Sequence, residues 1–453
     1  MKNEKLRQSI FSKRTFAKEC TSPWSIFVVC CILIMPVLFI ACEYNNKPGL
    51  NYPAMSTDTT GSPTITGIVP ALNAVAGVRE ITIVGTNLGV RNGDTNWVYI
   101  GGVQPMFKEI QDSYIIIYRP GLSTDRYGKA IDVSVTNSKM IENSSHIAYA
   151  MELPGTVVGN YSAMPSLLAV ELDNQENIYT TSARTVYETD FAGVTQTTLI
   201  NMAEFGGPTV TEYTYITAMS FGPGAYGRNL FIADGLNHIS RICVLDTIWN
   251  ANRPVKLPVP GVVSQLDFDE KGNIYTAGNG NLYFADSSVG MGTAPTFTAI
   301  SGYPPIANMN LIKIRVVKES GNQYLYVADP THVWKSQVMG VGSSFNGTLL
   351  VDLSTHPELS GCTISSFEID ENSSIFLCLK NSPKYSLFIC ENNGSVTPFY
   401  SDPRILPNTV DKLMWGNSKY LYLISSSLSG AGKIYRMTLD RNGAPYQGRT
   451  FIK

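Results

Sequence analysis

Histidine and charge are both scarce in this chain of 453 residues. It has four histidines, and charged residues make up 15% of the sequence, against about a quarter in an average protein. So few histidines limit metal binding and acid–base catalysis, and the sequence contains no C-x-x-C, H-E-x-x-H, G-x-S-x-G or P-loop motif. The formal net charge of −2 argues against the broad basic surface that binds nucleic acid. The composition therefore predicts neither a nucleic-acid partner nor a bound cofactor.

Helix-forming stretches are also missing, and residues typical of strands and turns take their place. Long runs of Ala, Glu, Lys and Leu are absent, whereas the chain has 38 glycines, 25 prolines and 24 tyrosines. Aromatic residues favour strands, and glycine and proline favour the turns between them. The composition predicts an all-β protein, and the chain is long enough for two or three domains.

Cysteine is sparse in the part of the chain that is expected to fold. Half of the eight cysteines lie within the first 42 residues, and the others are Cys243, Cys362, Cys378 and Cys390. If a hairpin turn is centred on residues 382–383, Cys378 faces Leu387 and Cys390 faces Ile375. The two thiols then lie on opposite faces of the sheet. We therefore expect no disulfide between them and interpret both as small buried hydrophobic residues.

The longest apolar run lies near the N-terminus. Six basic residues occur between positions 2 and 18, residues 25–41 are apolar, and Cys42 follows directly. This order is typical of a secretory signal. The segment Phe39-Ile40-Ala41-Cys42 resembles a bacterial lipobox, with Phe39 where leucine is usual. The resemblance implies that residues 1–41 are a lipoprotein signal peptide. It also implies that Cys42 is lipidated and anchors the protein in a membrane. The resemblance of the whole architecture to surface lipoproteins, described below, implies that this is the outer membrane, at the cell surface.

An uncleaved transmembrane anchor is the alternative for this segment, because the apolar run is nearly long enough to span a bilayer. Residues 42–63 contain proline, glycine, serine and threonine without any apolar periodicity. This composition predicts a flexible tether between the membrane and the first folded domain.

Residues 64–150 alternate short apolar segments with turn residues, which predicts a small β-sandwich. The expected strands include residues 81–84, 97–102, 113–120 and 130–137. The segment resembles the IPT/TIG family of immunoglobulin-like domains. The matching residues are Ile68-x-Pro70, Gly77, Ile81-Thr82-Ile83-x-Gly85-x-Asn87-Leu88-Gly89, Val98-x-Ile100-Gly101-Gly102 and Val133-x-Val135-x-Asn137. Such domains usually act as spacers in bacterial surface proteins, and the resemblance implies that role here.

An apolar-aromatic pair recurs six times in residues 151–453, at intervals of 44–52 residues. The pairs are Ile178-Tyr179, Leu230-Phe231, Ile274-Tyr275, Leu325-Tyr326, Ile375-Phe376 and Leu421-Tyr422. Each pair has one strand-like segment before it and two after it. Four strands per repeat predict a six-bladed β-propeller, in which ring closure covers both faces of every sheet. A further segment near residues 151–164 is expected to supply the closing strand.

The second repeat, residues 231–242, reads FIADGLNHISRI and resembles the NHL repeat family. The resemblance implies an NHL-like propeller. Propellers of this type include a zinc-dependent lyase whose metal is held by several histidines. Here only His238 and His332 occupy comparable positions, and zinc needs three or four ligands, so we expect no metal site. Asp234 and Asp329 are expected to be turn residues that accept hydrogen bonds from the backbone.

Long loops with aromatic residues join the last strand of one repeat to the first strand of the next. We expect these loops to surround one mouth of the propeller channel, where aromatic faces and nearby amides suit sugar rings or peptides. Ordinary packing within the loops is the alternative for the tyrosines. The predicted ligand-binding residues are Tyr213, Tyr215, Trp249, Tyr303, Tyr400 and Arg404.

Lipid anchor, tether, immunoglobulin-like spacer and propeller together resemble surface lipoproteins of Bacteroidota that accompany outer-membrane nutrient importers. The resemblance implies a non-catalytic lipoprotein that binds a glycan, or less often a peptide, and assists an importer. Two alternatives remain open. One is a lyase or hydrolase that works at the propeller mouth, and the other is a scaffold that binds another lipoprotein or a transporter. No catalytic residue is predicted.

Overall fold

The computed structural model describes residues 61–89, 96–137, 144–162, 164, 167, 169–182, 184–201, 216–223, 229–233, 238–243, 255–287, 296–303, 309–337, 344–391, 394–406, 410–425 and 432–449. The predicted signal peptide, Cys42 and nearly all of the tether lie outside these ranges. Within the ranges the chain forms β-strands and three-residue 3₁₀ helices such as Thr124–Arg126. No helix in the described part is long and apolar enough to cross a membrane. The prediction of an all-β protein is confirmed.

Two antiparallel sheets form the predicted β-sandwich, with strand orders β1-β2-β5-β4 and β3-β6-β7. The strands are β1 (Thr64–Val69), β2 (Glu80–Thr86), β3 (Asn96–Ile100), β4 (Phe107–Ile110), β5 (Tyr114–Tyr118), β6 (Ala130–Asn137) and β7 (Ser145–Ala150). Alternate residues of each strand point between the sheets. Ile81 and Ile83 of β2 and Val133 and Val135 of β6 are fully buried there. The alternation seen in the sequence therefore identifies the inner face of the sandwich.

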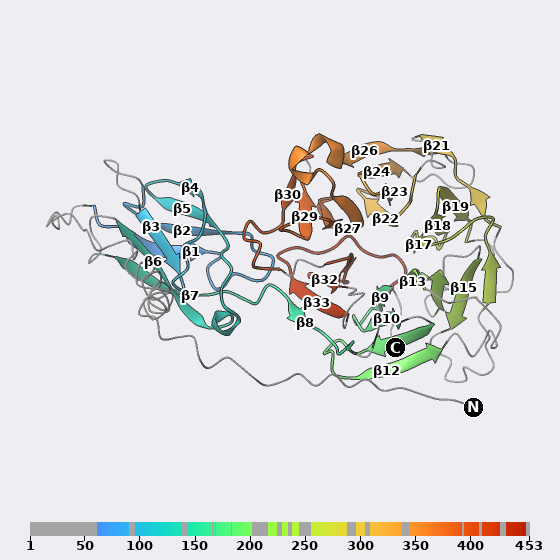
Figure 1. Ribbon diagram of the computed structural model, residues 1–453, viewed down its shortest axis with the longest axis horizontal. Coiled ribbons are helices and arrows are strands. Elements are labelled where there is room, and N and C mark those ends of the chain that lie inside the picture. The colour runs from blue at the N-terminus through green and yellow to red at the C-terminus, as the bar shows by residue number, and fades with distance from the viewer. Residues whose placement is uncertain are drawn as a thin grey trace, which may run out of the picture. The chain divides into compact units, whose positions relative to one another are not determined.

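Six four-stranded sheets follow the sandwich in sequence and surround a common centre (Figure 1). The first sheet contains β9 (Val170–Leu172), β10 (Ile178–Ser182), β11 (Thr185–Thr189) and β12 (Gln196–Asn201). The second contains β13 (Ala218–Phe221), β14 (Asn229–Ala233), β15 (His238–Cys243) and β16 (Val255–Pro258). The third contains β17 (Gln265–Phe268), β18 (Ile274–Gly278), β19 (Asn281–Ala285) and β20 (Thr298–Ala299).

The remaining three sheets repeat this arrangement. The fourth contains β22 (Lys313–Glu319), β23 (Asn322–Ala328), β24 (His332–Gln337) and β26 (Thr348–Asp352). The fifth contains β27 (Thr363–Ile369), β28 (Ile375–Lys380), β29 (Leu387–Cys390) and β30 (Val396–Pro398). The sixth contains β31 (Lys412–Trp415), β32 (Tyr420–Ser425), β33 (Lys433–Thr438) and β8 (Thr156–Val157). Every predicted apolar-aromatic pair lies in the second strand of its sheet, so the prediction of six blades is confirmed.

The sixth sheet is completed by the strand that comes first in the propeller sequence. β8 pairs antiparallel with β33, and Val157 faces Tyr435. The backbone amide of Val158 donates a hydrogen bond to the carbonyl of Ile434 at 2.9 Å. The prediction that a segment near residues 151–164 closes the ring is therefore confirmed. A closed ring removes sheet edges that could otherwise pair with another chain.

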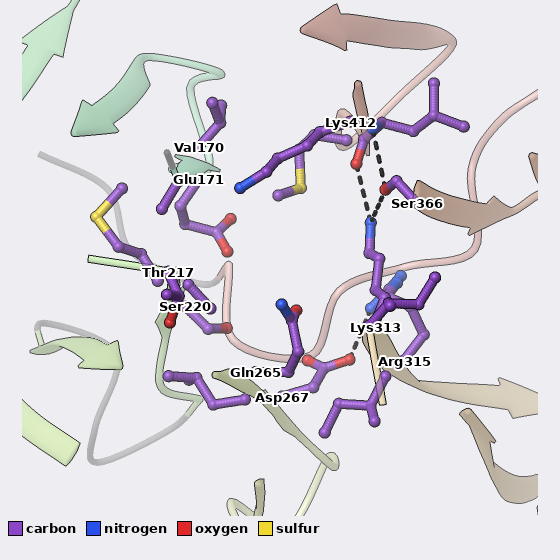
Figure 2. Close-up of a pocket in the computed structure, with 18 of the residues that line it drawn as sticks. Val170, Glu171, Thr217, Ser220, Gln265, Asp267, Lys313, Arg315, Ser366 and Lys412 are labelled. Carbon is purple, nitrogen blue, oxygen red and sulfur yellow. Dashed lines mark hydrogen bonds and ion pairs between the residues drawn. The ribbon is translucent and has the colours of Figure 1, made fainter. Parts of the chain in front are cut away.

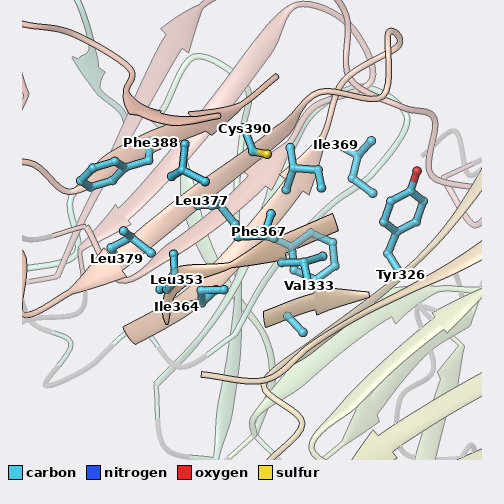
Figure 3. Packing of buried hydrophobic residues seen from close by; sticks show 14 of the residues in the cluster. Tyr326, Val333, Leu353, Ile364, Phe367, Ile369, Leu377, Leu379, Phe388 and Cys390 are labelled. Carbon is cyan, nitrogen blue, oxygen red and sulfur yellow. The ribbon is translucent and has the colours of Figure 1, made fainter. Parts of the chain in front are cut away.

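Each pair of neighbouring sheets in the ring shares its own apolar core, so six clusters of buried side chains lie at six interfaces. Figure 3 shows the cluster between the fourth and fifth sheets, where Tyr326 packs with Phe367 and Leu377. The cluster between the sixth and first sheets joins Ile434 to Ile178. Because each blade buries its faces only against its neighbours, the stability of a blade depends on the complete ring.

An aspartate–tyrosine contact recurs at the turn between the first and second strands of a sheet. In the first sheet Asp173 accepts hydrogen bonds from the backbone amide of Asn177 at 2.9 Å and from the hydroxyl of Tyr179 at 3.4 Å. In the third sheet Asp269 accepts a hydrogen bond from the hydroxyl of Tyr275 at 3.4 Å. The contact supplies a partner for a tyrosine hydroxyl that lies within the packed ring.

The sixth sheet lacks this aspartate and uses a carboxylate from the first sheet instead. Gly416 stands in the position of the aspartate, and Glu176 Oε2 accepts a hydrogen bond from the hydroxyl of Tyr422 at 2.8 Å. Glu176 Oε1 accepts from the amide of Asn417 and from the hydroxyl of Ser418, both at 3.0 Å. A Cβ atom at position 416 would lie 2.7 Å from Glu176 Oε2, so glycine is needed for this approach. Glu176 therefore joins the two ends of the ring.

The fifth sheet has the strand register that the cysteine argument predicted. Cys378 faces Leu387 and Cys390 faces Ile375. The thiols of Cys362, Cys378 and Cys390 are free and buried. Burial raises the pKa of Cys390 to about 11 and raises the pKa of Cys378 still further. Both thiols are therefore protonated at neutral pH and are poor nucleophiles.

Replacing Glu176 by alanine tests the closure of the ring. The change leaves the Tyr422 hydroxyl and the Asn417 amide without their acceptor, and we expect the free energy of unfolding to fall by about 2–4 kcal/mol. Urea denaturation followed by circular dichroism measures this. Glu358→Ala is the matched control, because the Glu358 side chain is 64% exposed and its loss should change stability by less than about 0.5 kcal/mol. Equal unfolding midpoints for the two variants would contradict the assigned role of Glu176.

Alkylation under native conditions tests the environment of the two cysteines in the fifth sheet. Iodoacetamide at pH 8 should leave Cys378 and Cys390 unmodified in the folded protein, because buried and protonated thiols react slowly. After unfolding without reductant both should react fully, since no disulfide joins them. Peptide mass spectrometry measures the modified fraction. Cysteines that become reactive only after reduction would show that the register is wrong.

Candidate functional site

The first strands of the six sheets line the centre of the ring. Alternate residues in or beside β9, β13, β17, β22, β27 and β31 face it and form two layers. The layer at the strand starts consists of Ala169, Ala218, Gln265, Lys313, Ser366 and Lys412. Two residues further along each strand, the second layer consists of Glu171, Ser220, Asp267, Arg315, Glu368 and Met414. Six repeats thus contribute polar and charged side chains to one channel.

A cavity of about 80 Å³ lies at the strand-start end of this channel. Figure 2 shows Glu171, Gln265 and Lys412 pointing into it from the first, third and sixth sheets. Alanine at positions 169 and 218 leaves room on one side of the channel. Sites that enclose a whole drug-sized ligand measure about 300–1,000 Å³. The cavity is therefore suited to one end group of a ligand rather than to an entire ligand.

One wall of the channel is a buried network of ion pairs around Arg315. The guanidinium of Arg315 lies 3.0 Å from the carboxylate of Asp267 and 3.3 Å from that of Glu368, and Lys313 Nζ lies 2.6 Å from Glu368. Burial alone would raise the pKa of Glu368. The charges of Lys313 and Arg315 outweigh that effect and hold the pKa below its usual value. Because each charge in the network has a counter-ion, removal of one side chain would leave its partner buried without a counter-ion.

The C-terminal segment 443–449 crosses the channel and forms its floor. Arg449 pairs with Glu171 at 2.6 Å, and the hydroxyl of Tyr446 donates a hydrogen bond to Glu368. The ring of Tyr446 lies between two guanidinium groups, 3.2 Å from Cζ of Arg315 and 3.5 Å from Cζ of Arg449. Cation–π contacts of this kind are strong when they are shielded from water. The segment therefore connects the first, fourth and fifth sheets beneath the cavity.

Lys412 differs from the other cations of the channel. Within the described part of the chain its Nζ has no hydrogen-bond or ion-pair partner. Burial, and then the charge of Lys313, lower the pKa of Lys412 to about 8. A desolvated ammonium group without a counter-ion costs free energy. Such a residue in a cleft indicates a functional rather than a structural role.

Two more polar groups at the cavity have unused hydrogen-bonding capacity. Glu171 Oε1 accepts from Arg449 and from the amide of Leu172 at 2.8 Å, which leaves Oε2 without a partner among the described residues. Burial raises the pKa of Glu171. The side-chain amide of Gln265 makes no hydrogen bond with any described residue. The cavity therefore offers a cation, an acceptor and an amide that both donates and accepts.

Several predicted ligand-binding residues cannot be compared with this cavity. Tyr213, Tyr215 and Trp249 lie outside the described residues, so their roles stay predictions. The backbone of Tyr303 lies in β21 (Gly302–Tyr303), which pairs in parallel with β25 (Phe345–Asn346). This short pairing connects the loops that follow the third sheet and β24.

Tyr400 and Arg404 lie where the sandwich contacts the propeller. Tyr400 is 4% exposed, and its hydroxyl donates a hydrogen bond to the carbonyl of Ala76. Arg404 pairs with Asp402 at 2.6 Å, and Asp402 also accepts from the amide of Gly121 at 2.8 Å. Neither side chain lines the cavity of the channel. The structure thus separates these two residues from Glu171, Gln265 and Lys412.

The histidine and aspartate of the fourth sheet form a turn. Asp329 accepts hydrogen bonds from the amides of Thr331 and His332, both at 2.8 Å, so its predicted role as a turn residue is confirmed. His332 Nδ1 lies 3.1 Å from Asp329, and its Nε2 lies 3.6 Å from Asp352. Within the described ranges no group of three or more His, Cys, Asp or Glu side chains is arranged to hold a metal. Asp234 lies outside these ranges.

The sequence analysis did not identify Glu171, Gln265 or Lys412 as site residues. A usable signal was present in the aligned first strands, which read AVELD, AMSFG, QLDFD, KIRVV, SFEID and KLMWG. In four of them a charged residue stands between two apolar neighbours at the third position. Charged residues are rarely buried unless they are paired. A charge at the third repeat position of a buried strand therefore points to the channel and would have identified Glu171. Gln265 and Lys412 stand at the first position, which this pattern does not mark.

Comparison with known proteins identifies the sandwich. Residues 63–150 match the IPT/TIG domain family. This confirms the resemblance seen in the sequence of that segment. The match covers the sandwich alone and leaves the propeller unassigned. No curated protein sequence matches the chain significantly.

Solved structures show distant similarity to most of the chain. An auxiliary nutrient binding protein from Bacteroides thetaiotaomicron is 12% identical, with a TM-score of 0.48, and the match covers 83% of this chain and 98% of that protein. An auxiliary nutrient binding protein from Bacteroides ovatus is 11% identical, with a TM-score of 0.44 and the same coverage. Virginiamycin B lyase from Staphylococcus aureus is 8% identical, with a TM-score of 0.41, and the match covers 63% of this chain and 99% of the lyase chain. Similarity at this level carries no conclusion about what this chain binds.

Proposed function

We propose that this protein is a non-catalytic binding protein that holds the end of a glycan nutrient in the channel cavity of its propeller. The observation that carries the proposal is the set of polar groups around the cavity. Glu171 Oε2, the Gln265 amide and Lys412 Nζ converge there without partners among the described residues. Sugar hydroxyls both donate and accept hydrogen bonds, so they suit a mixed set of this kind.

The size of the cavity limits the part of the ligand that it receives. A volume of about 80 Å³ accommodates an end group, and the following sugar rings would lie outside it on the rim. The sequence assigns Tyr213, Tyr215 and Tyr303 to the loops of that rim, and aromatic rings of this type stack on the flat faces of sugars. A peptide is the alternative ligand for the same rim.

A lyase or hydrolase acting at the same mouth is a second candidate function. Glycoside hydrolysis needs two carboxyl groups about 5–10 Å apart on either side of the scissile bond. In the described channel Asp267 and Glu368 are engaged by Arg315 and Lys313. Glu171 is the channel carboxylate there with an oxygen available to a ligand. This arrangement favours binding over hydrolysis.

The N-terminal segment supports a location at the outer membrane. Lipidation of Cys42 would anchor the chain, and the tether of residues 42–63 would give it reach. The sandwich of residues 64–150 would act as a spacer for the propeller of residues 151–453. In this proposal the protein captures its ligand at the cell surface and assists an outer-membrane importer. Service as a scaffold for another lipoprotein or a transporter is the third candidate, and co-purification from detergent would favour it.

Replacing Gln265 by leucine tests the binding site. We expect glycan affinity to fall about tenfold, because one or two hydrogen bonds of about 1 kcal/mol each are lost. Affinity electrophoresis of the full-length protein in detergent, with gels that contain different glycans, measures the change. Gln337→Leu is the matched control, because Gln337 is exposed at the end of β24. The proposal fails if no glycan retards the protein, or if Gln265→Leu is retarded as strongly as the control.

Replacing Lys412 by methionine tests how much the unpaired charge lowers the free energy of unfolding. The pKa of Lys412 is about 8 in the folded protein and is expected near 10.5 when unfolded, so the unfolded state binds more protons between these values. Burial of Lys412 therefore destabilises the protein below pH 8, and stability rises with pH toward 10.5. Each tenfold difference in proton affinity between the two states corresponds to about 1.4 kcal/mol, and because Lys412 is only partly buried the cost at pH 7 is at most about 3 kcal/mol.

We therefore expect Lys412→Met to raise the melting temperature by several degrees at pH 7 and by less at pH 10. Differential scanning calorimetry of both proteins at the two pH values measures this. Lys433→Met is the control, because Lys433 is exposed and its replacement should leave the melting temperature unchanged. A Lys412→Met variant that is less stable than wild type at pH 7 would show that the ammonium is satisfied in the folded protein.

A further inference from the structure

The described charges of the channel do not balance. Three carboxylates face four cations, and each carboxylate has a cation of its own. Glu171 pairs with Arg449 at 2.6 Å, Asp267 with Arg315 at 3.0 Å and Glu368 with Lys313 at 2.6 Å. The fourth cation, Lys412, lies at the cavity and forms no ion pair with any described residue; the adjacent Asp411 favours its charged form but is itself 3.9 Å from Lys380.

The position of Lys412 determines which group can neutralise its charge. Lys412 belongs to the layer at the strand starts, next to the opening, whereas the paired charges of Asp267 and Arg315 lie one layer deeper. A group that enters the cavity therefore meets Lys412 and Lys313 first, and of these two Lys313 is already paired with Glu368. Because the surroundings exclude part of the water, an ion pair formed there is stronger than one at the surface.

We infer that the ligand is an acidic sugar whose anionic group, a carboxylate or a sulfate ester, binds Lys412. The inference rests on the proposed glycan-binding function and specifies the chemical class of the glycan. Gln265 and Glu171 Oε2 then bind hydroxyl groups of the same sugar ring. A neutral sugar would leave the ammonium of Lys412 desolvated and unpaired, which a binding site disfavours.

The carboxylate of Glu171, which belongs to the sheet next to that of Lys412, limits the charge of this group. Glu171 points toward the same space as Lys412, and a second negative charge on the ligand would meet its carboxylate. Like charges brought together in a poorly hydrated site repel strongly. One negative charge is therefore favoured, which suits a uronic acid or a sulfate ester and disfavours the dianion of a phosphate monoester. Thr217 and Ser220 of the neighbouring second sheet also line the cavity, and their hydroxyls donate to the carbonyls of Ala233 and Phe221.

Protonation of Lys412 couples this recognition to pH. Burial and the charges of Lys313 and Lys380 lower the pKa of Lys412, and the carboxylate of Asp411 opposes them only in part. Nearly all Lys412 side chains are protonated at pH 6, and the protonated fraction falls as the pH rises past the pKa of about 8. An anion that binds next to Lys412 favours the ammonium form and raises the pKa. Binding near pH 8–9 should therefore take up protons, and affinity for an acidic ligand should fall as pH rises above 8.

Titration calorimetry with three matched oligosaccharides tests the inference on the full-length protein in detergent. The oligosaccharides differ only in the terminal residue, which is glucose, glucuronate or glucose 6-sulfate. At pH 7 the wild-type protein should bind at least one of the two acidic forms at least tenfold more tightly than the neutral form. That preference should shrink at pH 10. Near pH 8.5 the heat of binding in buffers of different ionisation enthalpy should show proton uptake.

Variants of Lys412 identify the residue responsible. Lys412→Met should lose the preference for acidic forms and the proton uptake, whereas Lys433→Met should keep both. Lys412→Arg retains a charge that does not titrate in this range, so a preference that persists to pH 10 without proton uptake is expected. Thermal melts confirm that each variant is folded.

Three outcomes would overturn the inference while the proposed glycan binding stands. They are equal affinity for neutral and acidic forms, an acidic preference that survives Lys412→Met, and tighter binding of a phosphate monoester than of the singly charged forms. Tight binding of a peptide through its C-terminal carboxylate, lost in Lys412→Met, would replace the acidic sugar by a peptide. Failure of all saccharides and peptides to bind would refute the proposed function itself.

Discussion

A β-sheet with two apolar faces is stable only when both faces are covered, and the propeller depends on this constraint. Each of the six sheets buries its faces against its neighbours, so the seam between the last sheet and the first is the point on which the ring depends. Three different contacts secure that seam. They are the pairing of β8 with β33, the apolar cluster around Ile434 and the carboxylate of Glu176. Backbone, apolar and polar contacts thus act at the same interface.

Ring closure also determines the chemistry of the centre. Residues of the first strands that point away from the neighbouring sheets have nowhere to lie but the channel, which is narrow enough for side chains from different blades to meet. Arg315 from the fourth sheet reaches Asp267 of the third and Glu368 of the fifth, and the C-terminal segment adds Arg449 and Tyr446 from below. The charged side chains of the deeper layer thereby neutralise one another and form a rigid base beneath the cavity.

Much of the architecture could be predicted from the sequence, because strand, turn and repeat signals are local. The apolar-aromatic pairs located the second strand of every sheet, and the alternation around Cys378 and Cys390 gave their register. The contacts of the channel are not local. Arg315 and Glu368 are 53 positions apart, and their pairing depends on which blades are neighbours. The aligned strands show that these positions are charged, but ring geometry is needed to show that they meet.

The same distinction between local and non-local signals applies to Tyr400 and Arg404, which do not line the channel cavity. Tyr400 lies in a loop between blades, and the sequence gives no sign that the sandwich will cover it, whereas the side chain of Arg404 in the same loop stays 68% exposed. The bonded pair Gly121 and Asp402 is separated by 281 positions, so the contact between sandwich and loop leaves no local signal. Composition can therefore suggest that an aromatic loop binds a ligand, but only the domain contact shows which of its side chains remain accessible.

Stability and recognition make opposite demands on Lys412. A propeller selected for stability alone would pair this lysine or have an apolar residue in its place. Two positions along the same strand, the channel residue is the apolar Met414. Among the described residues Lys412 has no counter-ion, although Lys313 in the same layer is paired with the carboxylate of Glu368. Because an unpaired and partly buried charge lowers stability whenever no ligand is bound, its retention is best explained by a partner that arrives from outside. The excess charge is then a property of the free protein, and the ligand completes the electrostatic pairing that the deeper layer already has.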